Sequence, residues 1–450
     1  MRCCGWNQET DTLFSYYTEL ALLSFRRSPG LTALMVLAIA FGVAASMTTF
    51  SVYRAVSGDP MPWKSGRIFV PQVDTWGPTE RDKDGEPRSS LDYATAVALT
   101  RAHRGTAQAP MYKISPAVQA EAAASHPVNI DGHAVGSEFF PMLDVPFLYG
   151  AGWTLQDDER RANVIVISQR LNGKLFQGRN SVGQSLLVAG RSYRIVGVVG
   201  HWDPQPRFFD VVNTGGFTTT REDAFLPFNT AIAAGIETTG NTGCSKTPTE
   251  SGIAGLTRSN CVWISYLVQL DDERSVAAYM AYLDGYARQL RDSGAVTWEP
   301  NNRLRDIPAW LDARHVVPAD TGASLLVALG LLVVCLVNTS GLLLARFLRR
   351  SGEIGVRRAL GAPRHAIYAQ FLTEAGMIGL AGGVLGIALT GVGVACVHWL
   401  LPVDIAQLAR IDPSLLLLTL GLALGSTLVA GLYPTFRAAL VQPTWQLKSQ

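Results

Sequence analysis

The residue types that most often carry chemistry occur in this chain of 450 residues, but their spacing matches no catalytic or metal site. ATPase phosphate loops need G-x-x-x-x-G-K-[S/T], and the pair Gly173–Lys174 lacks the preceding glycine loop. The seven histidines are scattered without the H-E-x-x-H spacing of zinc sites. A G-x-S-x-G nucleophile elbow is also absent from the sequence. We therefore predict a non-catalytic chain with no cofactor and no metal, in which any ATP is bound by a partner subunit.

Two acidic runs, 157–159 and 271–273, are the remaining groups of carboxylates. Each lies where a predicted strand or helix meets a turn. Because charged side chains are mostly solvent-exposed, we interpret both runs as solvated turns rather than as acid–base pairs.

The residues that do cluster are basic. Residues 346–367 contain six arginines and the single acidic residue Glu353. Glu353 and Arg357 are four residues apart, in the favourable order for an ion pair on a helix. Gly361 is expected to end this helix, and Pro363 discourages its continuation. A short arginine-rich helix parallel to a membrane offers a surface that a soluble partner can bind. The alternative is that the arginines only set topology and bind anionic lipid.

Four segments without Asp, Glu, Lys or Arg decide the fold class. Each has at least the ~20 residues that a helix needs to cross a bilayer. The chain is 48% hydrophobic and only 16% charged, against about 25% charged in soluble domains. We predict a membrane protein with four transmembrane α-helices and a large mixed α/β extracytoplasmic domain between helices 1 and 2. The segments are 28–53, 321–345, 375–403 and 413–436.

Arginine placement predicts the orientation, because Lys and Arg near the ends of spans stay in the cytoplasm. Arg26 and Arg27 precede the first span, six arginines follow the second, and Arg437 follows the fourth. We predict a multi-pass inner-membrane protein with cytoplasmic termini and a periplasmic domain. The net charge of +2 offers no excess for nucleic acid.

The first apolar run begins too late, and is too long, for a cleaved signal peptide, so we interpret it as a retained anchor. Residues 11–27 place Leu13, Tyr17, Leu20 and Leu23 on one side at helical spacing. This pattern favours a helix in the inner membrane interface, and the alternative is a solvated lead-in.

Alternation and turn residues predict an α/β or α+β outer domain. The expected strands are 68–73, 163–168 and 262–270, with a hairpin of 185–188 and 193–199 around the turn 189–192. The expected helices are 91–101 with Ser90 as N-cap, 169–176 and 275–291. Loops are expected at 213–220 and 233–257.

Cys244 and Cys261 both fall in the outer domain, where the compartment is oxidising. We predict that they form a disulfide that closes a Gly/Thr/Ser-rich segment. The alternative is two free buried thiols.

Several sequence segments resemble one family. EIGVRRALGAPRHAIYAQFLTEA, from Glu353, resembles the signature E-I-G-[I/V]-R-[R/K]-A-[L/I]-G-A of MacB/FtsX-type ABC permeases. The ending GLYPTFRAALVQPTWQLK is similar to the family's G-x-x-P-x-x-[R/K]-A-A turn and its closing P-x-x-A-L. The segments 138–154 and 163–200 are similar to the first half of the family's outer domain. In this chain Ala151 replaces the usual Arg, Asn241–Asn260 is an expected insertion, and Trp445–Gln446 replace a small residue.

The resemblance implies a dimeric permease, made of two copies or of two homologous permeases, above separate ABC ATPase subunits. Motion of the cytoplasmic loop would be transmitted to the outer domain, and the motor contact would involve Glu353, Arg357, Arg358, Gly361 and Ala362. The implied function is efflux or secretion of peptides, antibiotics or lipids, with a periplasmic adaptor, an outer-membrane channel and membrane lipid as further partners. The alternatives are a lipoprotein-extraction permease, an FtsX-like signalling permease and a non-transport receptor.

The implied packing of spans uses the small-residue spacings Gly379–Gly383 and Gly382–Gly386 in span three, although these glycines could also face lipid. Glu374, at the inner end of this span, is interpreted as interfacial. The predicted segments are an interfacial amphipathic helix at 1–27, transmembrane helix 1 at 28–53, the MacB-like domain at 54–318, helix 2 at 319–345, the coupling loop at 346–367, helix 3 at 368–399, an outer loop at 400–412, helix 4 at 413–435 and a cytoplasmic tail at 436–450.

Overall fold

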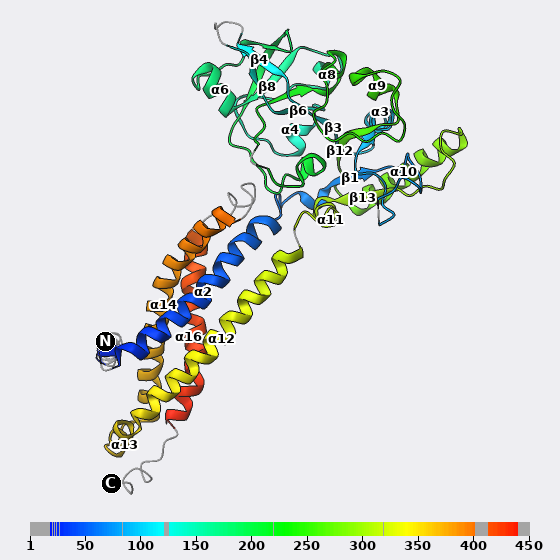
Figure 1. Cartoon of the computed structure of the whole chain (residues 1–450). Coiled ribbons are helices and arrows are strands. Elements are labelled where there is room, and N and C mark those ends of the chain that lie inside the picture. Colours follow the sequence, from blue (N-terminus) through cyan, green and yellow to red (C-terminus); the bar gives the residue numbers. More distant parts are fainter. Residues whose placement is uncertain are drawn as a thin grey trace, which may run out of the picture. The chain divides into compact units, whose positions relative to one another are not determined.

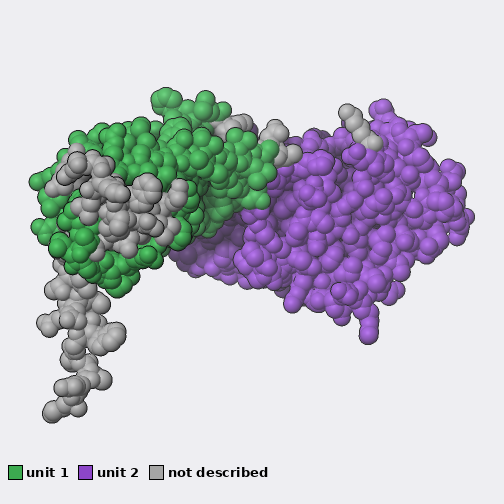
Figure 2. All heavy atoms as spheres, turned by 90° about the horizontal axis from the view of Figure 1, so that it is seen from below, with its two compact units in different colours: residues 1–56, 318–450 green, residues 57–317 purple. Residues whose placement is uncertain are grey.

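The computed structural model of the chain divides into two compact units, residues 1–56 with 318–450 and residues 57–317 (Figure 2). Most of the predicted N-terminal helix, the outer loop from 401 and the tail from 440 lie outside the described residues. The residues that the structure describes are 19, 21, 23, 25, 26, 28–82, 84–120, 126–218, 220–317, 319–400 and 413–439.

The first unit consists of long apolar helices (Figure 1). Four described helices contain stretches of 24 to 34 residues that are long and apolar enough to cross a membrane. A short helix, α13, joins the second of them to the third. The helices are α2 (Pro29–Ser57), α12 (Ala319–Arg349), α13 (Ser351–Ala359), α14 (Arg364–Leu400) and α16 (Pro413–Ala439).

Helix α16 differs from the expectation near its end. Helix 4 was predicted to end at 435, and the family motif that the ending resembles has a turn at this proline, but the helix continues through Pro434 to Ala439. Proline removes one backbone donor, and membrane helices tolerate it because neighbouring groups satisfy the freed carbonyl.

The glycines of α14 lie against two different helices. A Cβ added at Gly379 would overlap Thr427 of α16, and one at Gly383 would come 2.9 Å from Leu420 of the same helix. A Cβ at Gly382 would come 2.9 Å from Ile39 of α2, whereas Gly386 has ordinary contacts with α2. Because an added methyl has no room at three of these positions, α14 approaches both neighbours closely.

The second unit is built on one mixed sheet of 13 strands among the described residues. Its order is β13-β1-β12-β3-β6-β11-β8-β10-β9-β4-β5, with β2 paired to β12 and β7 to β10. The pairs β6–β11 and β8–β10 are parallel, and the others are antiparallel. The strands are β1 (Ile68–Gln72), β2 (Leu91–Asp92), β3 (Ala107–Ile114), β4 (Ala117–Ala120), β5 (Val128–Asn129), β6 (Gly132–Val135), β7 (Phe147–Gly150), β8 (Val164–Ser168), β9 (Ser185–Val188), β10 (Arg191–Val199), β11 (Ala224–Pro227), β12 (Val262–Gln269) and β13 (Arg303–Asp306).

Two of the helices, α3 and α10, pack on this sheet through a shared apolar core. Leu99 of α3 and Leu283 of α10 are buried in the same cluster as Ile264 and Val268 of β12. The helices of this unit are α3 (Tyr93–Ala102), α4 (Phe139–Met142), α5 (Leu155–Glu159), α6 (Gln169–Phe176), α7 (Val211–Thr214), α8 (Phe228–Ala233), α9 (Gly252–Arg258), α10 (Glu273–Asp292) and α11 (Ile307–Ala313), with 3-10 turns η1 (Ser65–Arg67) and η2 (Phe208–Asp210).

Three local expectations for this unit were wrong in detail. Asp92 rather than Ser90 caps α3, because its Oδ1 accepts the N–H of Thr95 at 2.9 Å while residues 91–92 pair with β12. The β9–β10 turn has only Ala189 and Gly190, both with positive φ, as a two-residue hairpin of type I′ requires. Helix α9 begins inside the predicted loop 233–257 and ends one residue beyond it; it is too short for sequence periodicity to reveal.

Candidate functional site

The charged residues at the end of α12 meet a carboxylate on α14. Arg346 Nη2 lies 2.9 Å from Glu374 Oε1, and Arg350 Nη1 donates to Glu374 Oε2 at 3.3 Å. Arg346 Nη1 also donates to Thr32 Oγ1 of α2 at 3.0 Å. Glu374, which the sequence analysis places at the membrane interface, has a side chain that is only 1% exposed and is paired with two guanidinium groups. A buried carboxylate requires such compensation for its lost hydration.

Helix α13 is tied to this pair through Arg350. Arg350 Nε donates to Glu353 Oε2 at 3.3 Å, and Arg357 Nη2 donates to Glu353 Oε1 at 3.1 Å, at the predicted spacing of four. Arg357 Nη1 continues to Gln370 Oε1 of α14 at 2.9 Å. Hydrogen bonds involving charged groups therefore connect α12, α13 and α14, and an additional bond reaches α2.

The inner face of α13 packs against α12 and α14 through apolar contacts. Ile354 is buried in one cluster with Ile367 and Phe371 of α14 and with Phe347 of α12. The rings of Phe347 and Phe371 lie 4.1 Å apart between centroids. Burial of an aliphatic side chain contributes roughly 1.5–3 kcal/mol, so α13 is held by packing as well as by charge.

The outer face of α13 carries solvent-exposed apolar side chains. Val356 is 60% exposed, and Leu360, directly after the helix, is 83% exposed. The turn to α14 begins at Gly361, whose φ of +92° favours glycine, and the N–H of Ala362 donates to Arg357 O at 3.0 Å. The side chain of Arg358 lies outside the described atoms.

The structure thus brings Glu353 and Arg357 together and puts Gly361 and Ala362 at the end of α13. Sequence spacing missed Arg350, Gln370 and Glu374 as members of the same network. The one available signal was a single carboxylate, Glu374, bordering a charge-free span, which suggests a buried partner. The identity of that partner depends on how α12 and α14 pack against each other.

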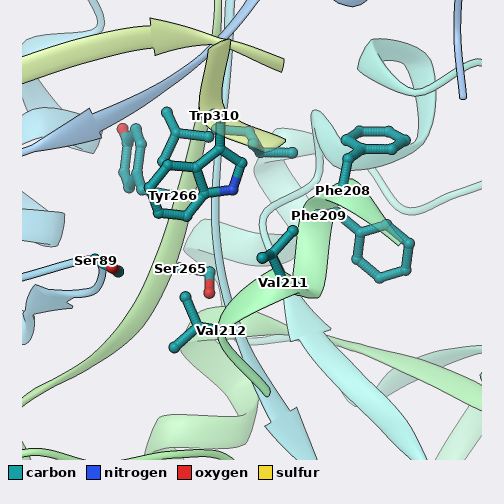
Figure 3. Close-up of a pocket in the computed structure, with 10 residues that line it drawn as sticks. Ser89, Phe208, Phe209, Val211, Val212, Ser265, Tyr266 and Trp310 are labelled. Carbon is teal, nitrogen blue, oxygen red and sulfur yellow. The ribbon is translucent and has the colours of Figure 1, made fainter. Parts of the chain in front are cut away.

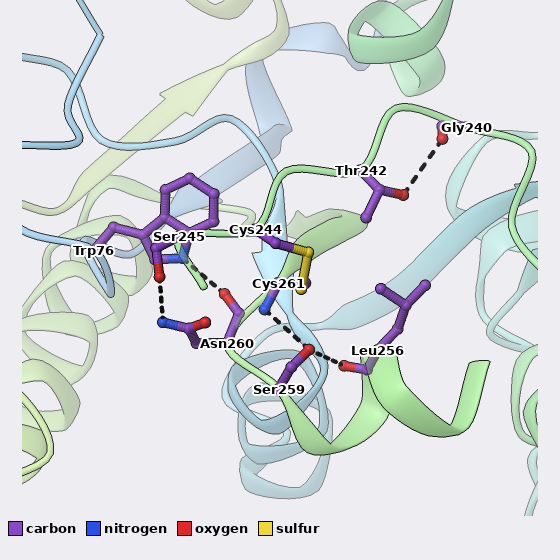
Figure 4. The surroundings of a disulfide bond; sticks show 9 residues. All are labelled: Trp76, Gly240, Thr242, Cys244, Ser245, Leu256, Ser259, Asn260 and Cys261. Carbon is purple, nitrogen blue, oxygen red and sulfur yellow. Dashed lines mark hydrogen bonds between the residues drawn. A yellow bond between two sulfur atoms is a disulfide. The ribbon is translucent and has the colours of Figure 1, made fainter. Parts of the chain in front are cut away.

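Cys244 and Cys261 of the α/β unit form a disulfide, with an S–S distance of 1.97 Å (Figure 4). Backbone bonds in both directions between Gly243 and Val262 align the two segments next to it. The indole N–H of Trp76 donates to Asn260 O at 2.7 Å beside the bridge. The bridge closes the segment that the sequence identifies as an insertion.

Buried charges also occur in the α/β unit. His133 of β6 lies 2.9 Å from Glu222 through Nδ1 and 3.3 Å from Asp210 through Nε2. Burial alone would lower the pKa of His133, but the two carboxylates outweigh it and raise this pKa to about 10. Arg207 Nη1 donates to Glu222 Oε1 at 2.9 Å, and Arg207 Nη2 donates to Asp203. This network holds the segment before α7 on the sheet.

Asp158 contradicts the prediction of a solvated acidic turn. Its side chain is buried and accepts the backbone N–H groups of Ser137 and Asn229, each at 3.3 Å. Burial raises the pKa of Asp158 to about 6, although these bonds act in the opposite direction. The second run is partly structural too, because Asp272 caps α10 through the N–H of Ser275 at 2.7 Å.

A small internal cavity lies where η2 and α7 meet β12 and α11 (Figure 3). Phe208, Phe209, Tyr266 and Trp310 line its aromatic side. Its volume of about 10 Å³ has room for at most one water molecule. We therefore interpret it as a packing gap rather than a ligand site.

Comparison with known proteins covers nearly the whole chain. Residues 32–286 match the family described as MacB-like periplasmic core domain, and residues 325–443 match FtsX-like permease C-terminal. The chain is 27% identical over 326 residues to the pyoverdine export ATP-binding/permease protein PvdT of Pseudomonas aeruginosa, covering 72% of this chain and 43% of that protein. It is 24% identical over 441 residues to the macrolide export ATP-binding/permease protein MacB of Azoarcus sp., covering 96% and 59%.

Among solved structures, the periplasmic region of MacB from Actinobacillus actinomycetemcomitans aligns with a TM-score of 0.35 and 12% identity. The alignment covers 58% of this chain and 94% of that structure. The chain spans about half the length of the curated relatives it matches.

Proposed function

Because this chain belongs to the family of MacB/FtsX-type ABC permeases, with a MacB-like periplasmic core domain and an FtsX-like permease domain, we propose that it is the permease subunit of an ABC-type complex. In this proposal the chain transmits motion from an ATPase on a separate chain to its own periplasmic domain. The ATPase pushes α13 from the cytoplasm, and α2 and α12 carry the motion outward.

One observation carries the proposal. Glu353 on α13 and Glu374 on α14 share Arg350, and Arg346 extends the contacts to Thr32 of α2. Side chains joined by charged hydrogen bonds resist independent movement, so displacement of α13 would be passed to the neighbouring helices. The apolar core around Ile354 supports the same conclusion, since close-packed interiors transmit strain.

The free face of α13 supports an assignment of the motor contact. Val356 and Leu360 are the strongly exposed apolar side chains there, whereas Glu353 and Arg357 are bonded within the chain. We assign Val356 and Leu360 to contact the ATPase, and Glu353 and Arg357, with the turn at Gly361 and Ala362, to hold the helix in position. The arginine distribution supports cytoplasmic termini, which would put α13 beside the motor.

The proposed role is efflux or secretion of peptides, antibiotics or lipids by a complex with a second permease copy or a homologous permease. The names of the relatives support export, since they describe proteins that export pyoverdine or macrolides. A periplasmic adaptor and an outer-membrane channel are further proposed partners.

Co-purification from native membranes tests the motor contact. We expect the tagged chain to retain an ABC ATPase subunit, identified by mass spectrometry of the intact complex. Val356→Asp should lose this subunit because a charge replaces an apolar contact. Leu155→Asp is the matched control, since Leu155 is an exposed apolar residue of the α/β unit. Retention of the ATPase by Val356→Asp would contradict the assignment.

A further inference from the structure

A cleft lined by both charged and apolar residues opens beside the disulfide of the α/β unit. Its volume is about 240 Å³, far above the roughly 10–15 Å³ that a single water molecule needs. Its walls come from the segment between β1 and β2, from residues 241–243 and from Arg314 after α11. The packing gap of Figure 3 adjoins it, because Ser89 and Val212 line both.

Two arginines in this cleft share one carboxylate. Arg88 Nη1 donates to Asp82 Oδ1 at 3.2 Å, whereas Arg314 Nη1 lies 3.6 Å from Asp82 Oδ2, beyond hydrogen-bond distance. Arg88 Nη2 also lies 3.6 Å from Glu80. The Nε of Arg88 is buried without a hydrogen-bond partner in the described part of the chain. Within the described part of the chain, Arg88 thus has one hydrogen bond to a carboxylate and Arg314 a longer ion pair, which leaves guanidinium donors for a ligand.

Aromatic rings hold both guanidinium groups in place. Arg88 lies over the ring of Trp76 at 4.8 Å, and Arg314 lies over that of Trp310 at 5.7 Å. Trp76 is itself fixed by its bond to Asn260 O at 2.7 Å. Side chains held in this way lose little further freedom when they bind a ligand.

Residues that flank the disulfide on both sides form another part of the cleft wall. The bridge Cys244–Cys261 is shown in Figure 4. Gly243, next to it, exchanges backbone bonds of 2.8 and 3.0 Å with Val262. The N–H of Asn241 donates to Asn213 Oδ1 at 2.6 Å. Residues of the expected insertion thus complete the cleft in a fixed position.

We propose that this cleft binds a small organic carboxylate, such as the free C-terminus of a short peptide. Paired guanidinium donors match the two oxygens of a carboxylate. Ser89, Ser90 and Thr242 add hydroxyl groups, while Val212 and Val262 offer apolar surface for a small side chain. The proposal goes beyond the transmission role and requires neither an ATPase nor transport.

Calorimetric titration of the full chain in detergent tests this site, with the dipeptide Ala-Val, its C-terminal amide and inorganic phosphate as probes. We expect the free acid to bind, the amide not to bind and phosphate to bind more weakly. Arg314→Gln should weaken dipeptide binding roughly 10-fold or more, because a charge-assisted bond is lost. Asp82→Asn should strengthen it on the order of 2- to 5-fold by removing the competing carboxylate.

Arg104→Gln is the matched control, since Arg104 is an exposed arginine over Tyr282 at 5.8 Å, outside the cleft, and it should leave binding unchanged. Equal binding of acid and amide, phosphate binding as tight as that of the dipeptide, or no heat with any probe would overturn the proposal. Weaker dipeptide binding by Asp82→Asn would also overturn the proposal. Because this variant is expected to bind more tightly, loss of folding cannot produce the expected result.

Discussion

Glu374 of α14 and Arg346 of α12 form an ion pair of 2.9 Å in which the carboxylate side chain is 1% exposed and the guanidinium side chain 4%. Such a pair contributes little net stability, because desolvation offsets most of the attraction. Loss of one partner, in contrast, leaves the other charge buried. The geometry of the helix junction therefore depends on both residues being present.

Glu374→Gln should destabilise the helical unit by about 3 kcal/mol, because Arg346 and Arg350 then lose their shared counter-charge. Glu353→Gln is the matched control: Glu353 is paired with Arg350 and Arg357 but is 38% exposed, and its loss should cost less than about 1 kcal/mol. Unfolding of both variants in detergent measures the difference. Equal losses would show that burial of Glu374 is unimportant.

Exchange of the charges by Glu353→Arg with Arg357→Glu should preserve membrane insertion and abolish stimulated ATP hydrolysis by the partner. The new arginine would face Arg350, so α13 would lose its polar connection to α12 and α14. Protease protection of the spans reports insertion, and the ATPase rate of the reconstituted complex reports coupling. Normal stimulation would reject the role of these two residues.

Gly379→Ala should destabilise packing of α14 on α16 by about 1–3 kcal/mol, since the added methyl overlaps Thr427. Gly376→Ala is the control within the same helix, because its Cβ would meet only Leu428 at 3.8 Å, an ordinary contact. Thermal unfolding in detergent compares the two variants. Equal midpoints would argue that α14 and α16 do not approach closely at Gly379.

His133 should make the stability of the α/β unit pH-dependent. Its pKa of about 10 in the folded chain exceeds the ordinary value of 6.5, so folding favours the charged imidazolium. The resulting stabilisation is complete below about pH 6.5 and is lost as pH rises towards 10. Unfolding midpoints of the wild type and of His133→Gln, followed by tryptophan fluorescence, should converge across this window. A gap that stays constant from pH 6.5 to 10 would refute the charged state of His133.

Much of the architecture was predictable because its signals are local. Span length and charge-free composition predict the four long helices, and a continuous apolar, β-branched run predicts the strand 163–168, observed as β8 at Val164–Ser168. The pairing of Glu353 with Arg357 follows from helical spacing alone. Short elements were less predictable, since α9 with seven residues and β2 with two are shorter than the windows in which a helical or strand pattern can be recognised.

Burial and long-range partners were decided only by the tertiary structure. Arg346 and Glu374 are 28 positions apart along the chain, and nothing near either residue specifies the other. Asp158 has the composition of a solvated turn but lies under the backbone of residues 137 and 229. The charge, size and periodicity of a residue are properties of the chain itself. The protein groups that replace the hydrating water of a buried side chain are determined only when separate elements pack together.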